Sequence, residues 1–214
     1  MSSMLRCGFD PMKLERVFIS HAHSDHVAEL TLLIQTLHGM SHGRKVQMYL
    51  PEEFVAPFRA YLPAVYLPPE RLRLDLEVSG YNEGAVFSGD FQVTAIANSH
   101  QAKLRDEMKR LGFPNKGESF SLKIDVGNKS VLYSADVGSF EDLRGQLENL
   151  DYAIIETTHI DIRDIFDHAL KPTVGAFVLT HLGSSEEVSE LRRKIEGSGL
   201  KNLLIAEDGL RLEL

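Results

Sequence analysis

Hydrophobic and polar residues alternate in several short segments of the chain, which is the pattern of a half-buried β-strand. In residues 72–78 four aliphatic side chains are separated by Arg73, Asp75 and Glu77. Residues 120–126 alternate in the same way, and Gly127-Asn128 then predicts a hairpin into the next strand. The other segments that predict strands are 17–20, 46–50, 85–87, 91–97, 131–134, 152–155, 177–180, 203–205 and 210–214.

Helical spacing of apolar residues predicts helices between these strands. One such helix contains Val27 to Leu37, and Gly39 then offers a stop. A second begins after Pro51, because a proline and the following acidic residues suit a first helical turn. Three more are predicted at 141–150, 162–170 and 185–195. Strands dominate first, and helices and strands alternate later, which favours an α/β fold of mixed sheets with outer helices.

Composition narrows the class of protein. The 214 residues, 43% hydrophobic and 25% charged, are enough for one sizeable core, so we expect a single domain over 1–214. The net charge of −8 argues against a surface built mainly to hold nucleic acid. Cys7 is the only cysteine, which excludes an intramolecular disulfide, and no segment is long and apolar enough for a membrane span. These features predict a cytoplasmic protein without a membrane partner.

Ligand-type side chains are concentrated in residues 21–26, which read His-Ala-His-Ser-Asp-His directly after an apolar strand segment. A lone histidine is more often a core or surface residue. Three imidazoles and one carboxylate within a single turn are not explained that way, and they are the ligands that suit zinc, manganese or iron. The segment therefore predicts a metal site, with enough ligands for two ions.

Three further candidate ligands follow predicted strands. His100 comes after the strand 91–97, Asp136 after 131–134 and His181 after 177–180. With the first cluster they make seven nitrogen and oxygen ligands on loops that one sheet edge can gather.

In this order the segments resemble the motifs of the metallo-β-lactamase-fold superfamily of binuclear metallohydrolases. Residues 21–26 match its His-x-His-x-Asp-His motif, and residues 133–138 are similar to its bridging-aspartate segment, with Ala135 where glycine is usual. The resemblance implies a four-layer αβ/βα sandwich of two mixed sheets with outer helices. The other matching segments are 99–100, the third-histidine motif, and 179–182 and 206–209, which resemble the ribonuclease Z-like branch.

The resemblance also implies a division of roles within a binuclear site. Two divalent ions, zinc foremost with manganese or iron as alternatives, would activate a bridging hydroxide to cleave a phosphodiester. One ion would be held by His21, His23 and His100, the other by Asp25, His26 and His181, with Asp136 between them.

A proton donor for the leaving group is less sharply defined. Glu156-Thr157-Thr158-His159 resembles a Glu-Ala-Thr-like segment of the same branch, so His159 is the candidate acid with Glu156 orienting it. The alternatives are that His159 is only a polar loop residue, or that His168 on the next helix is the acid. Asp25, His159 and Glu156 are thus the candidate catalytic residues.

Several readings of the function stay open. The 156–158 and 179–182 segments favour a phosphodiesterase. The alternatives are hydrolysis of another ester, a thioester or a lactone on the same fold, and a metal-binding regulatory module with little turnover. A small phosphodiester is favoured over folded RNA, because no long tRNA-gripping insertion is found and the chain is acidic.

Three other features carry expectations of their own. The basic stretch 103–116 is either a solvated amphipathic helix or a flap that grips phosphate. Only twenty residues precede the first motif, and residues 4–8 resemble the remnant of a strand, so we expect a shortened first sheet. A homodimer that covers its exposed edge is a hypothesis. His38 and His42 match no family ligand, and we expect both on the surface.

Overall fold

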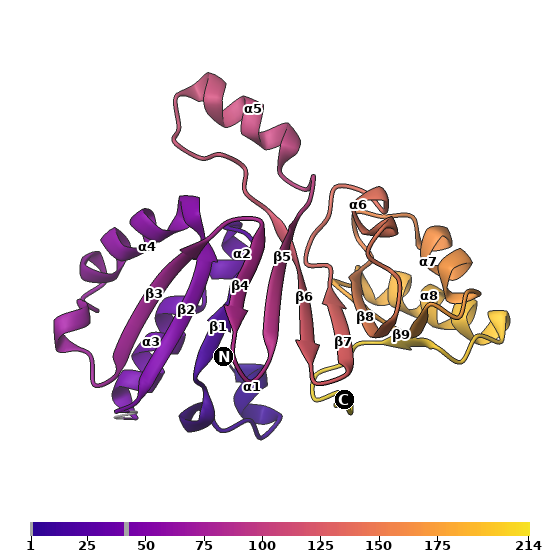
Figure 1. Cartoon of the computed structure of the whole chain (residues 1–214), viewed down its shortest axis with the longest axis horizontal. Coiled ribbons are helices and arrows are strands. Elements are labelled where there is room, and N and C mark those ends of the chain that lie inside the picture. The colour runs from indigo at the N-terminus through magenta and orange to yellow at the C-terminus, as the bar shows by residue number, and fades with distance from the viewer. Residues whose placement is uncertain (1, 41–42) are drawn as a thin grey trace. The chain divides into compact units, whose positions relative to one another are not determined.

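The computed structural model describes residues 2–40 and 43–214, so His42 lies outside the described residues. The chain forms two compact units (Figure 1). The first contains residues 1–82 and 107–118, and the second contains residues 83–106 and 119–214. Helix α5 (Ala102–Leu111) crosses the boundary, and each of its residues is at least partly exposed, as expected of a solvated helix.

The first unit is built on a three-stranded sheet with the order β1-β2-β3. All pairs are parallel, with Val17 opposite Met48 and Met48 opposite Val78. Met48 packs in one apolar cluster with Ile34 of α3 and Phe58 of α4. The elements are α1 (Ser2–Arg6), η1 (Pro11–Lys13), β1 (Arg16–Phe18), α2 (Ser24–Val27), α3 (Leu30–Gly39), β2 (Lys45–Pro51), α4 (Glu52–Ala64), η2 (Pro69–Arg71) and β3 (Asp75–Tyr81).

The second unit is built on a seven-stranded sheet with the order β10-β9-β8-β7-β6-β5-β4 (Figure 1). Leu132, Ile155 and Phe177 on three neighbouring strands are fully buried in its core, together with Ile165 of α7. The elements are β4 (Gly84–Ser88), β5 (Gln92–Ala97), β6 (Phe120–Val126), β7 (Lys129–Tyr133), α6 (Glu141–Arg144), β8 (Leu150–Glu156), α7 (Ile162–Ala169), β9 (Val174–Thr180), α8 (Ser185–Ser198) and β10 (Leu203–Ile205).

Strand direction in this sheet decides where loops gather. β7, β8, β9 and β10 pair in parallel. β5 is antiparallel to β6, and β6 is antiparallel to β7, so β5 runs in the same direction as β7. The residues that follow β5, β7, β8 and β9 therefore emerge at the same edge of the sheet.

The α/β fold with two sheets is confirmed, and several local predictions differ. The helix predicted to contain Val27 to Leu37 is interrupted, because α2 ends at Val27 and α3 begins at Leu30. Only the larger sheet is mixed, since the smaller one is parallel. Residues 4–8 are not a strand, because α1 covers Ser2–Arg6. The helix predicted at 141–150 ends at Arg144, and Asn149, with a left-handed φ of 56°, directly precedes β8 at Leu150. Residues 210–214 form no strand, and Leu210 and Leu214 are exposed.

No helix in residues 2–40 and 43–214 has the length and apolar character needed to cross a bilayer.

Replacing Leu132 tests the core of the second unit. Leu132→Ala leaves a cavity at a fully buried position of β7, so we expect the free energy of unfolding to fall by about 3–5 kcal/mol. Leu170→Ala is the matched control, since Leu170 is 72% exposed, and its effect should stay within about 0.5 kcal/mol. Urea denaturation measures both, and equal effects would contradict this assignment of the core.

Candidate metal centre

The first ligand group consists of His21, His23, Asp25 and His26 of the first unit. His21 follows β1 and is fully buried. Its ring centroid lies 4.0 Å from that of His26 and 4.7 Å from that of His23. Three imidazoles are therefore held within ring contact by a segment of six residues.

The backbone explains this compactness. His23 is extended, with φ −64° and ψ 148°, and forms the N-cap of the short helix α2. Its carbonyl accepts the N–H of His26 at 3.0 Å, so the chain reverses and brings His26 back toward His21. The Asp25 carboxylate lies on the same turn, with Oδ2 3.6 Å from Nε2 of His26. The Ser20 hydroxyl lies 3.1 Å from Nδ1 of His21 and orients its ring.

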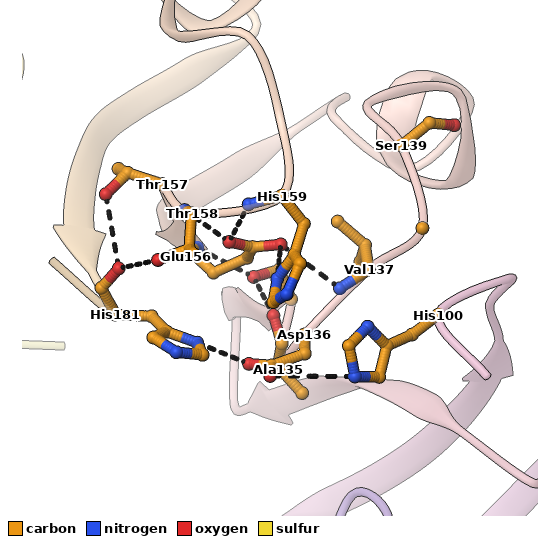
Figure 2. A network of polar contacts seen from close by, with 12 residues as sticks. His100, Ala135, Asp136, Val137, Ser139, Glu156, Thr157, Thr158, His159 and His181 are labelled. Atoms are coloured by element: carbon orange, nitrogen blue, oxygen red, sulfur yellow. Dashed lines mark hydrogen bonds and ion pairs between the residues drawn. The ribbon is translucent and has the colours of Figure 1, made fainter. Parts of the chain in front are cut away.

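The second ligand group consists of His100, Asp136 and His181 of the second unit, and Figure 2 shows Asp136 between the two imidazoles. The Asp136 residue is 3% exposed. Its Oδ1 lies 2.7 Å from Nδ1 of His181, and its Oδ2 lies 3.7 Å from Nε2 of His100. The three side chains come from the loops after β5, β7 and β9, which share one sheet edge.

The separation of His100 from Asp136 fits a divalent metal ion, whereas the shorter His181–Asp136 distance is that of a direct hydrogen bond. Zinc binds histidine nitrogen and carboxylate oxygen at about 2.0–2.2 Å, so two ligand atoms of one ion lie at most about 4.4 Å apart. The His100 and Asp136 ligand atoms satisfy this limit at 3.7 Å. His159 belongs to the same cluster, because its ligand atom lies within 4.8 Å of those of His100 and Asp136.

Two ligand loops contain a residue in the left-handed region. Ala135 and His181 both have φ of 49°, a conformation that costs a non-glycine residue about 1–2 kcal/mol. The bend at Ala135 accounts for the glycine that is usual at this position of the motif. At His181 the backbone is held from the side, because its carbonyl accepts the Thr158 hydroxyl at 2.6 Å (Figure 2).

Glu156 is a second buried carboxylate, at the end of β8 and 1% exposed. Its Oε2 accepts the backbone N–H groups of Thr158 at 2.6 Å and His159 at 2.9 Å. Its Oε1 lies 3.0 Å from Nδ1 of His159 and accepts the N–H of Val137 at 3.3 Å (Figure 2). The protein thus satisfies this carboxylate with its own donors, and the geometry makes Glu156 a support for the His159 ring.

The two candidate acids lie in different surroundings. The His159 ring is 4.9 Å from that of His100 and 5.6 Å from that of His181, and its side chain is 37% exposed. The His168 ring instead lies 4.8 Å from that of Phe140, with Nδ1 3.2 Å from the carbonyl of Asp164 in its own helix. Of the two, only His159 is placed among the second ligand group.

Tyr133 lies in β7, three residues before Asp136. Burial, followed by the negative charge of Asp136, raises the pKa of the Tyr133 hydroxyl. The group therefore stays neutral at ordinary pH and adds no negative charge beside the carboxylate.

Two supporting residues were not identified from the sequence. The Thr158 hydroxyl donates to the His181 carbonyl and so holds the His181 loop, and no pattern in the sequence predicts this hydrogen bond. Asp142 accepts hydrogen bonds from two ligand loops. The spacing of Ser139 and Asp142 resembles a helix-capping box, which is the one signal that was available for Asp142.

Comparison with known proteins identifies the family of the chain. Residues 7–192 match the profile of the beta-lactamase superfamily domain. The chain belongs to this family. Ribonuclease Z from Archaeoglobus fulgidus is 25% identical over 252 aligned positions, which cover 94% of this chain and 81% of that protein. The match to ribonuclease Z from Thermococcus onnurineus is 27% identical but spans only 47% of this chain and 31% of that relative.

Solved structures share the fold of the chain. The metallo-beta-lactamase fold protein YhfI from Bacillus subtilis has a TM-score of 0.71 at 21% identity, over 98% of this chain and 81% of that one. The short form of human tRNase Z has a TM-score of 0.66 at 16% identity, and the match covers 97% of this chain and 82% of that one. The predicted metallo-β-lactamase fold and the ribonuclease Z-like resemblance are thereby confirmed.

Ser134 supplies a test of how the site is supported. Its fully buried hydroxyl accepts the N–H of Glu156 at 3.0 Å and donates to the Ala135 carbonyl at 2.7 Å. Ser134→Ala leaves both groups buried without this partner, so we expect unfolding free energy to fall by about 1–3 kcal/mol. The control Ser189→Ala removes an exposed helical hydroxyl, so the free energy of unfolding should fall by no more than about 0.5 kcal/mol. Thermal or urea unfolding compares the two variants. Similar losses would show that the hydrogen bonds of Ser134 contribute little to stability.

Proposed function

We propose that the protein is a binuclear metal-dependent hydrolase that cleaves a phosphodiester. In this proposal the residues of the two ligand groups would hold two divalent cations, zinc foremost, and Asp136 would be the ligand that the cations share. The observation that supports it best is the buried Asp136 carboxylate, which has an imidazole of the second ligand group at each of its oxygens. The order of the motifs and the family of the chain support the same assignment.

The chain's own residues define the rest of the chemistry. When bound, two such cations lower the pKa of a water to about 7 and neutralise charge on the phosphate. Glu156 engages Nδ1 of His159, so Nε2 of that ring is the atom that delivers a proton to the leaving oxygen. The partial exposure of His159 gives a substrate access to it, whereas the buried Glu156 keeps the ring oriented.

The substrate class follows from the relatives and from charge. The relatives are named ribonuclease Z, and a structural neighbour is a tRNase Z, which supports phosphodiester chemistry here. The net charge of −8 supports a small phosphodiester rather than a folded RNA, whose phosphates would be repelled by most of the surface. Thioester or lactone hydrolysis on the same fold and a regulatory module without turnover are the outcomes that the experiments below separate.

Replacing the bridging carboxylate tests metal binding and turnover together. Wild-type protein should contain two equivalents of metal and hydrolyse bis-p-nitrophenyl phosphate. In Asp136→Ala we expect both the second equivalent and the activity to be lost, because the ligand shared by the two ions is gone. Elemental analysis and a colorimetric assay measure these quantities.

Asp167→Ala is the matched control for that experiment, since Asp167 is exposed on α7 and should change neither quantity. Metal binding without turnover on phosphodiesters, thioesters or lactones would favour the regulatory module. Turnover of thioesters alone would replace the phosphodiester assignment.

The role of His159 is tested by varying the leaving group. His159→Ala should lower kcat about 10²- to 10⁴-fold for a dialkyl-type phosphodiester such as a cyclic nucleotide, whose leaving oxygen needs a proton. The loss should be much smaller for a p-nitrophenyl ester, whose leaving group departs unprotonated. His168→Ala serves as the control and should behave like wild type with both substrates. A His159→Ala loss of equal size on both substrates would argue for a role in binding instead.

A further inference from the structure

A single carboxylate oxygen connects two loops of the second ligand group. Oδ2 of Asp142, in the first turn of α6, accepts the Ser99 hydroxyl at 2.8 Å and the Ser99 backbone N–H at 3.1 Å. The same oxygen accepts the N–H groups of Gly138 at 2.9 Å and Ser139 at 3.3 Å. Ser99 directly precedes His100, and Gly138 lies two residues after Asp136, so the bonds reach both candidate ligand loops.

The two loops are in close contact at this point. A Cβ atom on Gly138 would lie 2.2 Å from the Ser99 hydroxyl oxygen and 2.8 Å from its carbonyl carbon, both far inside van der Waals contact. Glycine is therefore required for the observed spacing. Asp142 supplies the attraction that keeps the loops together, because an ionised acceptor makes stronger hydrogen bonds than a neutral one.

Asn98 forms a second connection between the same loops. Its Nδ2 donates to the Asp136 carbonyl at 3.1 Å, and its Oδ1 accepts the N–H of His100 at 3.1 Å. The backbones of the two ligands are thus tied both at Asn98 and at Asp142.

A role as a helix cap explains only part of the hydrogen bonds that Asp142 accepts. Its bonds to Gly138 and Ser139 are local and would satisfy the first turn of α6 in any protein. The two bonds to Ser99 join positions 43 residues apart and contribute nothing to that turn.

We propose that Asp142 is a positioning residue that fixes the separation of His100 from Asp136 and so sets the metal affinity of the site. The consequence for affinity rests on the proposed function, while the connection between the loops stands without it. Partners that orient metal ligands typically change affinity about 10- to 100-fold when they are removed.

Zinc competition with a chromophoric chelator measures the affinity in Asp142→Ala. We expect zinc to bind about 10- to 100-fold more weakly than in wild type, and Asp142→Asn to be intermediate, because the amide oxygen still accepts. Glu141→Ala is the matched control from the same turn. The Glu141 carboxylate forms an exposed ion pair with Arg144 at 2.7 Å, and zinc affinity should stay within about twofold of wild type. The visible absorption of the cobalt-loaded protein should also change in Asp142→Ala and not in Glu141→Ala.

Amide hydrogen exchange of the metal-free proteins tests the connection itself. Asp142→Ala should accelerate exchange at Ser99 as well as at Gly138, whereas a simple helix cap would accelerate only residues 138–144. An unchanged Ser99 rate, or zinc affinity equal to wild type in a variant that is folded, overturns the proposal. If the wild-type protein binds no zinc, the proposed function fails, and the Ser99 rate still decides whether Asp142 joins the loops. If Asp142→Ala does not fold, Gly138→Ala takes its place in the test. The added methyl group of Gly138→Ala would force the two loops apart, so this variant should also bind zinc more weakly than wild type.

Discussion

Two carboxylates buried at one sheet edge, Asp136 and Glu156, are the constraint on which the site depends. A buried negative charge is costly unless hydrogen bonds or opposite charge compensate it. Glu156 is compensated by three backbone N–H groups and the His159 ring. Asp136 has the His100 and His181 imidazoles at its two oxygens. Backbone donors therefore dominate the surroundings of Glu156, whereas Asp136 lies between two imidazoles that can also bind a cation.

The sheet supplies the positions from which this compensation is made. Because β5, β7, β8 and β9 run in one direction, the loops after them begin side by side, and each contributes one part of the second ligand group or its support. The loops then bend sharply. At the bends Ala135 and His181 take left-handed φ angles, which are strained for residues other than glycine. Hydrogen bonds from the Ser134 and Thr158 hydroxyls stabilise these conformations. Rigid strands and strained loops together give a preorganised arrangement of ligands.

Much of this arrangement could be predicted from the sequence. Alternating apolar residues located most strands to within a few residues, and the segment 120–126 coincides with β6. The candidate ligands of the second unit were found because each follows a strand that is readable in this way. Errors arose where the apolar spacing continued beyond the element that forms. The helix predicted at 141–150 ends at Arg144, and Leu210 and Leu214 lie outside any strand and are exposed.

The supports of the site were harder to predict for a physical reason. Ser99 and Asp142 are joined across 43 positions through one oxygen atom, and no local periodicity encodes such a contact. The measurement that tests the central claim most directly is anomalous diffraction at the zinc edge from crystals of the zinc-loaded protein. The account predicts two peaks about 3.5–4 Å apart, with Asp136 bound to both and histidines of both ligand groups around them. A single peak, or ions bound by only one of the two groups, would contradict it.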